Sequence, residues 1–296
     1  MSNKKALLLF VDGFGLGKEE KWKYNPIETG NLPVMQNLLK SRNMIPADAT
    51  LGVSGIPQSA SGQTAILTGI NAPKATGKHL NGFPNKKLRE IIQEENIFSK
   101  LRNRGLKVTN ANAYNKKFIS NLLNNSVGNE EMSVSTVATL SAGLSLYTEE
   151  DLKRGKSVYQ DLTGRIMIEK WKAKVPLRTP GEAGEILGNI VNSYDFTFFE
   201  YFQTDLAGHR KDFDIAYRVL EDLDQFIGTL LESLSLDNTL FVLVSDHGNI
   251  EDLSTADHTM NMVPVIALGN GSDAFRKRIR NIQSVTPGIE QYFSEE

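Results

Sequence analysis

The sequence predicts an α/β fold in which a mostly parallel sheet lies between two layers of helices, a three-layer α/β/α sandwich. Two observations support this prediction. Short, mainly apolar runs alternate along the chain with segments that have helical periodicity. In addition, aspartate or histidine follows several of the runs closely. Ligands of such folds bind beyond the carboxyl ends of the strands, so we expect a functional site at that edge of the sheet.

Five runs are predicted to be buried parallel strands: residues 6–11, 107–111, 196–201, 240–245 and 263–268. The first run ends at Asp12 and is too short for a signal-peptide core or a membrane span. The clearest helix is predicted over residues 212–234, where large apolar side chains recur at helical spacing, among them Phe213, Leu220 and Ile227.

Residues 114–181 fit the alternation of strands and helices poorly. This stretch contains polar loops, a run of small residues and a charged helical segment. No repeat, low-complexity tract or linker divides the chain. We therefore expect one domain over residues 1–296, with residues 114–181 forming a small insertion or lid within it.

Composition limits the classes of function. The 296 residues carry a formal net charge of −2 without a basic stripe, which argues against nucleic acid as a partner. The chain has no cysteine, so any metal must be held by histidine, carboxylate or hydroxyl groups. We expect no membrane partner and a cytoplasmic location.

The acidic residues and histidines that follow the predicted strands form a candidate metal site. Asp12 follows the first strand, and Asp205 and His209 follow the strand at residues 196–201. Asp246 and His247 follow the strand at residues 240–245, and His258 lies in the same loop. A single Asp-His pair is most often a solvated turn, but three of the four histidines of the chain occur in such motifs. Gly208 is expected to allow a tight turn between Asp205 and His209.

The segment Gly55-Ile-Pro-Gln-Ser-Ala-Ser-Gly-Gln-Thr64 has the character of a helix N-terminus with a serine as its cap. Such a terminus also attracts phosphate. A serine hydroxyl at this place is a candidate nucleophile if a metal ion lowers its pKa.

These motifs together resemble the alkaline phosphatase superfamily. Asp12-Gly13, Ser59-x-x-Gly62, Asp205-x-x-Gly208-His209, Asp246-His247-Gly248 and His258-Thr259 occur in the order of that superfamily, and are most similar to its branch of phosphopentomutase and cofactor-independent phosphoglycerate mutase. The resemblance extends over the whole core.

The resemblance implies two divalent metal ions, manganese or zinc rather than magnesium. One ion would be bound by Asp205, His209 and His258. The other would be bound by Asp12, Asp246, His247 and the hydroxyl of Ser59, which would also be the nucleophile. Gln63 stands where both mutases have histidine, and Asn31 resembles a polar position near the phosphate, so both are candidate substrate-binding residues.

The reaction that the resemblance implies is phosphoryl transfer to Ser59. Since the predicted insertion is smaller than the cap domain of the mutases, we expect a phosphatase or phosphodiesterase acting on a small phosphate ester. A sugar-phosphate mutase is the alternative, and a non-catalytic metal-binding module is a third possibility. A sulfatase is not favoured, because Ser59-Ala-Ser-Gly-Gln63 lacks the proline and arginine of that group.

Overall fold

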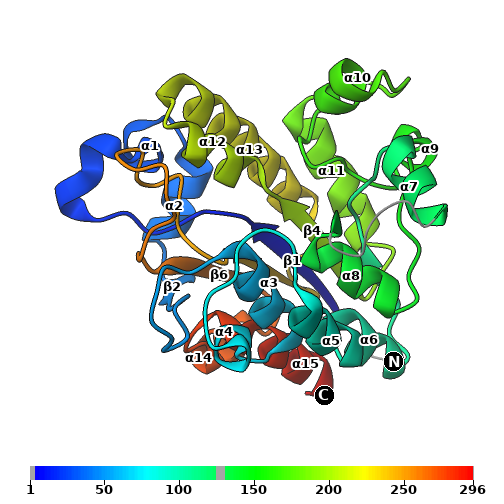
Figure 1. The fold of residues 1–296 in the computed structure, drawn as a ribbon. Helices are drawn as coiled ribbons and strands as arrows, with labels where there is room; N and C mark the ends of the chain where they lie inside the picture. The colour runs from blue at the N-terminus through cyan, green and yellow to red at the C-terminus, as the bar shows by residue number, and fades with distance from the viewer. Residues whose placement is uncertain (1–3, 125–130, 296) are drawn as a thin grey trace.

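The computed structural model describes residues 4–124 and 131–295, and its centre is a six-stranded sheet with the strand order β2-β6-β5-β1-β4-β3. Helices cover both faces of this sheet (Figure 1), so the predicted three-layer α/β/α architecture is confirmed. The strands are β1 (Lys5–Val11), β2 (Met44–Ala47), β3 (Val108–Asn110), β4 (Phe196–Tyr201), β5 (Thr239–Val244) and β6 (Val263–Gly269).

Side chains of β1 alternate between two hydrophobic cores, as the two-residue period of a strand requires. Ala6, Leu8 and Phe10 face one core. Helices on that side are α3 (Ser59–Thr68), α4 (Ala72–Thr76), α5 (Lys86–Glu94), α6 (Ile97–Asn103), α8 (Val134–Ser141), α14 (Ser272–Arg278) and α15 (Val285–Ser294), the last preceded by the short 3-10 helix η3 (Ile282–Ser284).

Leu7, Leu9 and Val11 of β1 face the second core on the opposite side of the sheet. This core is closed by α1 (Pro26–Thr29), α2 (Pro33–Lys40), α11 (Pro180–Val191), α12 (Gln203–Arg210) and α13 (Phe213–Ser233). The 3-10 helix η1 (Glu19–Tyr24) precedes α1. The predicted long helix is confirmed as α13, and the side chain of Asp212 caps it by accepting a hydrogen bond from the amide of Ile215 (3.0 Å).

Two features of the sheet differ from the prediction. Strand β6 was expected to be parallel to the others, but it pairs antiparallel with both β5 and β2. Strand β6 therefore begins at the edge of the sheet where β5 ends. The sequence reasoning also missed β2, a four-residue edge strand that contains Pro46. Proline weakens a strand signal and is tolerated mainly at sheet edges.

Within residues 114–181, α8 packs into the first core through Val134, Val137 and Ala138. Two other helices of this segment, α9 (Glu149–Lys153) and α10 (Arg165–Trp171), contribute Leu152 and Met167 to a separate small cluster. Helix α7 (Lys116–Leu123) completes the segment as far as it is described; residues 125–130 lie outside the described part. A role of the segment as a lid stays a prediction.

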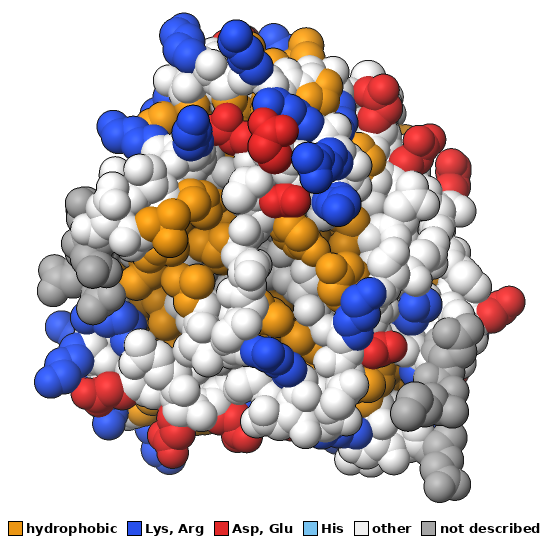
Figure 2. Space-filling view, turned by 90° about the vertical axis from the view of Figure 1, so that its right-hand side faces the viewer, with side chains coloured by type: hydrophobic (Ala, Val, Ile, Leu, Met, Phe, Trp, Pro, Cys, Tyr) orange, Lys and Arg blue, Asp and Glu red, His pale blue; other side chains and the backbone are white. Residues whose placement is uncertain are grey.

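Charged and hydrophobic side chains collect in different areas on one face of the molecule (Figure 2). Figure 2 shows Lys and Arg side chains gathered at the upper end of that face, above hollowed areas where hydrophobic side chains collect. Among the described helices, none has the combination of length and apolar character needed to cross a membrane.

Candidate metal centre

The predicted ligands meet at the carboxyl ends of β1, β4 and β5. Asp12 directly follows β1, and its amide donates a hydrogen bond to the carbonyl of Tyr201 at the end of β4 (2.9 Å). Asp246 and His247 follow β5 after one residue. His258 joins them because β6 is antiparallel, so the loop before β6 lies at this same edge of the sheet.

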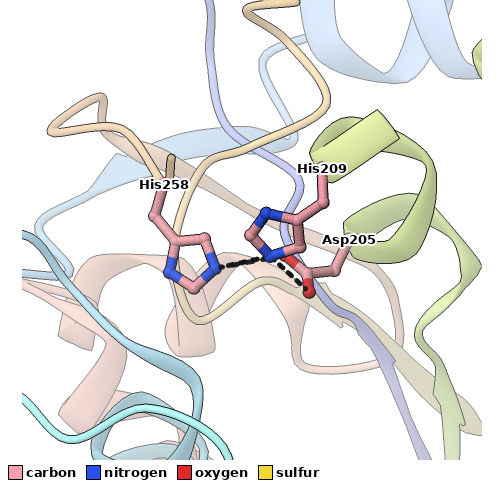
Figure 3. A group of neighbouring side chains, drawn as sticks. All are labelled: Asp205, His209 and His258. Atoms are coloured by element: carbon pink, nitrogen blue, oxygen red, sulfur yellow. Dashed lines mark hydrogen bonds and ion pairs between the residues drawn. The ribbon is translucent and has the colours of Figure 1, made fainter. Parts of the chain in front are cut away.

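One group of predicted ligands consists of Asp205, His209 and His258, which lie close enough together to hold a metal ion (Figure 3). The Nε2 atom of His209 is 3.3 Å from Asp205 Oδ2, and the Nε2 atom of His258 is 3.4 Å from Asp205 Oδ1. The two Nε2 atoms are 3.2 Å apart. Three ligand atoms thus converge without an atom between them, which is the arrangement that a metal ion fills.

Hydrogen bonds orient both imidazole rings of this group. The Nδ1 atom of His209 donates to the carbonyl of Ala256 (2.6 Å), and Nδ1 of His258 donates to the carbonyl of Pro57 (3.2 Å). A ring whose Nδ1 carries the proton presents the Nε2 lone pair as a ligand. Both rings are therefore oriented so that Nε2, once it has lost any proton, can bind a metal ion.

Asp205 and His209 both lie in α12, one helical turn apart, so the tight turn expected at Gly208 is wrong. Gly208 is needed for close packing instead. A Cβ atom at this position would lie 2.4 Å from Oδ1 of Asn249 and 3.0 Å from the amide nitrogen of Ile250.

A second group surrounds the Nε2 atom of His247, which is completely buried. This atom lies 2.9 Å from Ser59 Oγ, 3.3 Å from Asp12 Oδ1 and 3.5 Å from Asp246 Oδ2. Both of these carboxylate oxygens are buried without a hydrogen-bond partner among the described residues. Unpaired buried carboxylate oxygens are costly unless a cation compensates them, so the residues fit a bound metal ion.

The two groups are adjacent. The rings of His247 and His258 stack with centroids 3.7 Å apart, and Asp205 also belongs to a cluster with Asp12 and His247. Two ions at a short separation would therefore fit the arrangement better than one.

Burial and neighbouring charges shift the pKa values of three residues in this cluster. Burial, with the nearby charge of Asp246, raises the pKa of Asp12 to about 8. Burial alone would lower the pKa of His247, but the charges of Asp246 and Asp12 raise it to about 10. Burial would likewise raise the pKa of Asp205, but its hydrogen bond to His258 and the charge of His247 lower it to about 2. In the metal-free protein, protons therefore supply part of the positive charge that metal ions would bring.

Ser59 is the first residue of α3, so the predicted helix start is confirmed. The expected serine cap is wrong: the N-cap residue is Gln58, and it makes no side-chain cap. The Oγ atom of Ser61 instead accepts a hydrogen bond from the amide of Leu80 (3.0 Å), which leaves Ser59 as the serine facing His247. Close approach of α3 to the ligands depends on Gly62, where a Cβ atom would lie 2.9 Å from Cβ of Asp246.

The two predicted substrate-binding residues are placed differently. Gln63 is buried on α3, and its Nε2 donates to Oδ2 of Asp12 (3.1 Å). Asn31 is exposed just before α2 and is not part of the pocket that contains Ser59 and Gln63. The structure brings together Gln63, Ser59 and the predicted metal ligands, but not Asn31.

Sequence reasoning missed two residues that hold the site in place. The carboxylate of Glu251 is fully buried and accepts hydrogen bonds from the amides of Gly15 (3.0 Å) and Asn249 (2.7 Å). It also accepts from the side chains of Thr259 (2.5 Å) and Asn261 (2.9 Å). Its position between the two ligand motifs of one loop was the only signal in the sequence.

Asn249 is the second missed residue. Its Nδ2 atom donates to Oδ1 of Asp205 (2.8 Å) and to the Asp205 carbonyl oxygen (3.2 Å). Asn249 therefore orients a carboxylate that both ligand groups share.

A pocket of about 460 Å³ opens beside this cluster. Asp12, Ser59, Gln63 and Asp205 line its inner end. The remainder is lined by the loop before α5, the start of α7, the start of α8, the loop at residues 159–160 and the region from the end of β4 into α12. A substrate in this pocket would contact both the serine hydroxyl and the ligand cluster.

Comparison with known proteins agrees with this geometry. A family model described as the Metalloenzyme superfamily matches residues 4–288. The chain is similar to 2,3-bisphosphoglycerate-independent phosphoglycerate mutases of Desulforudis audaxviator (29% identity over 109 residues, 35% of this chain and 21% of that protein) and Halobacterium salinarum (38% over 79 residues, 25% and 16%). These alignments span about a fifth or less of either relative.

Solved structures share the fold over nearly the whole chain. They include the alkaline phosphatase of the Antarctic bacterium TAB5 (TM-score 0.58, 16% identity, 99% of this chain and 98% of that chain). Leishmania mexicana phosphoglycerate mutase is also similar (TM-score 0.60, 10% identity, 96% and 94%). The resemblance inferred from the motifs is thus confirmed, and the chain belongs to the metalloenzyme superfamily of alkaline phosphatase-like proteins.

Proposed function

We propose that the chain is a two-metal phosphoryl-transfer enzyme that hydrolyses a small phosphate ester through a phosphoserine at Ser59. The observation that carries this proposal is the position of the Ser59 hydroxyl, 2.9 Å from His247 Nε2 and within a cluster of buried carboxylates and imidazoles. A serine whose only role is to begin a helix has no reason to face such a cluster.

The metal ions would be held as the motifs imply. Asp205, His209 and His258 would bind one ion, and Asp12, Asp246, His247 and Ser59 the other. The set of imidazole and carboxylate ligands suits manganese or zinc. Ions bound there would neutralise charge on the phosphoryl oxygens and lower the pKa of the serine hydroxyl.

The chain itself positions the reacting groups. Of the amides in the first turn of α3, those of Ser61 and Gly62 donate to the carbonyls of Leu80 and Gln58. Within the described residues, no acceptor is bonded to the amides of Ser59 and Ala60, so both are available to a phosphoryl oxygen.

The proposed reaction has two displacements at phosphorus. The Ser59 Oγ–phosphorus bond forms as the bond to the ester alcohol breaks, the serine proton passes to solvent and the leaving alcohol takes up a proton. Water then attacks the phosphoserine, releases inorganic phosphate and restores Ser59.

Hydrolysis is favoured over a mutase reaction by two features. Helices α7, α8, α9 and α10, in the described part of residues 114–181, are five to eight residues long, and α8 packs into the core of the domain. Such a segment offers little to retain an alcohol while it reorients. Gln63 occupies the place of the histidine in both mutases and donates to Asp12, so phosphate handling at this position differs.

The test compares the metal-stripped protein, the protein reloaded with manganese or zinc, and Ser59→Ala on phosphomonoesters and phosphodiesters. Ser61→Ala is the matched control on the same helical turn. We expect release of inorganic phosphate or alcohol that requires metal and falls on the order of 10³-fold or more in Ser59→Ala. Formation of an isomer without release would indicate a mutase. No turnover at full metal occupancy would refute an enzymatic role and favour a metal-binding module.

A further inference from the structure

The wall of the pocket beside Ser59 is rich in aromatic side chains. Five of them line it: Phe83, Tyr114, Phe118, Tyr159 and Phe202. They come from four separate stretches of the chain, because only Tyr114 and Phe118 are close in sequence, so no single helix face accounts for their convergence. Since the inner end of the pocket holds the serine and the metal ligands, these aromatic residues surround the space for the alcohol part of an ester.

Part of this aromatic wall is rigid. The rings of Tyr114 and Phe118 stack with centroids 5.3 Å apart, and the hydroxyl of Tyr114 is hydrogen-bonded to that of Thr136 (3.0 Å). Tyr159 is buried, whereas Phe83 is 54% exposed at the rim. A flat apolar group would therefore meet fixed aromatic surfaces inside and a more exposed ring at the entrance.

The same wall offers no cation. Among the described residues that line the pocket none is lysine or arginine, and the sequence of residues 125–130 contains neither. Lys116 and Lys117, which adjoin the lining residue Asn115, line a different hollow, and Nζ of Lys117 lies 5.9 Å from the ring centroid of Trp171. That hollow adjoins α10, near the Lys- and Arg-rich upper end of the face in Figure 2.

Besides the predicted metal ligands, the charged residues that line the pocket are acidic. Glu131 is exposed, and Glu200 is buried with a hydrogen bond from the hydroxyl of Ser135. Burial raises the pKa of Glu200 to about 7, so this residue carries part of its negative charge at neutral pH. A carboxylate or a second phosphate on the alcohol part would lose its hydration and meet these acids without a compensating cation.

We propose that this pocket selects phosphate esters whose alcohol part carries no negative charge and has a flat, apolar portion. This inference rests on the proposed function, since it assigns the metal centre to the phosphoryl group and the aromatic wall to the alcohol. It excludes esters of acidic alcohols, such as phosphoglycerates, from the preferred substrates.

Non-hydrolysable phosphonates test the proposal by binding alone. Isothermal titration calorimetry of the manganese- or zinc-loaded protein compares methylphosphonate, benzylphosphonate and 4-carboxybenzylphosphonate. We expect benzylphosphonate to bind at least about fivefold more tightly than methylphosphonate, because the ring contacts the aromatic wall. We expect a similar or larger advantage over the carboxylated probe, because that probe meets only acids.

A charge added at the rim supplies the second measurement. Phe83→Arg places a cation at the pocket entrance, and since Phe83 is half-exposed the substitution does not disturb the core. The preference for benzylphosphonate over its carboxylated form is expected to fall below about twofold in this variant. Ile70→Arg is the matched control, because Ile70 is exposed but does not line the pocket, and it should leave the preference unchanged.

The outcomes separate this inference from the proposed function. Equal or tighter binding of the carboxylated probe, or no advantage of the benzyl group, overturns the inference even if Ser59-dependent hydrolysis is observed. If the phosphonates bind with the expected preferences but no phosphate ester is turned over in the hydrolysis assay, the result supports the inference and refutes the enzymatic role. Weak binding of all three probes with metal at full occupancy overturns the inference.

Discussion

Replacing Gly208 with alanine should weaken metal binding through a neighbour, although residue 208 is not itself a ligand. The new Cβ atom would lie 2.4 Å from Oδ1 and 2.6 Å from Cγ of Asn249, and 3.0 Å from the amide nitrogen of Ile250. Asn249 is buried and bonded twice to Asp205, so its side chain cannot move away without releasing that carboxylate.

The magnitude follows from two opposing effects. Alanine in place of a helical glycine stabilises a helix by about 1 kcal/mol. Contacts about 1 Å shorter than van der Waals separation in a packed site destabilise by about 1–3 kcal/mol. Net stability should therefore change by no more than about 2 kcal/mol, so the variant should fold. Loss of the group that orients a metal ligand typically weakens metal affinity by about 10–100-fold.

The assay is isothermal titration calorimetry, in which zinc or manganese is added to the metal-stripped variant. Gly228→Ala in α13 is the control, because there the new Cβ would meet only Cγ2 of Val34, at 3.2 Å. Asn249→Ala should reproduce the loss of affinity without a steric clash. Wild-type metal affinity in both Gly208→Ala and Asn249→Ala would refute the role assigned to this hydrogen bond.

Three further predictions concern the same centre. The folded metal-free protein holds the protons of Asp12 and His247 more tightly than the unfolded chain does, since their pKa values are about 8 and about 10 against usual values of 3.8 and 6.5. This stabilisation is complete below the unfolded values and is lost as pH rises through the folded ones. The Tm of the metal-free protein should therefore fall between about pH 4 and about pH 10, while the increase in Tm on adding metal grows; a flat profile in scanning calorimetry would contradict this. Glu251→Ala leaves four buried donors unpaired and should reduce the free energy of unfolding by on the order of 3 kcal/mol in a urea titration, and a loss below about 1 kcal/mol would show that water replaces the carboxylate. Gly62→Ala should weaken metal binding by pushing α3 away from Asp246, whose Cβ and carbonyl oxygen would lie 2.9 and 3.0 Å from the new methyl group; unchanged metal affinity would show that α3 adjusts.

The predicted strands and the long helix could be inferred from the sequence because their signals are local. Burial on both faces produces the continuous apolar runs of β1 and β5, and the amphipathic period of α13 extends over 21 residues. The predicted metal ligands could be inferred from the sequence for a similar reason. Asp12 and the pair Asp246-His247 follow strand ends closely, Asp205 lies in the helix that follows β4, and parallel strands bring their carboxyl ends to one edge.

Other features depend on contacts between distant residues. The direction of β6 depends on the edge of the sheet at which this strand begins. An apolar run has the same composition in either direction, so the sequence does not reveal it. The partners of Glu251 are spread from Gly15 to Asn261, so no local pattern marks that residue. The role of Gly208 could not be inferred either, because the atom that excludes a side chain there belongs to Asn249.

The antiparallel return of β6 also determines how the molecule would respond to a cut in its polypeptide. Ser254, Ala256 and Asp257 are exposed in the loop between β5 and β6, and ligands lie on both sides of them. Proteolysis there would leave two fragments joined by the β5–β6 pairing, with Asp246 and His247 on one and His258 on the other. A metal centre that draws on both fragments would act as a cross-link between them, so a chelator would loosen a nicked molecule far more than an intact one.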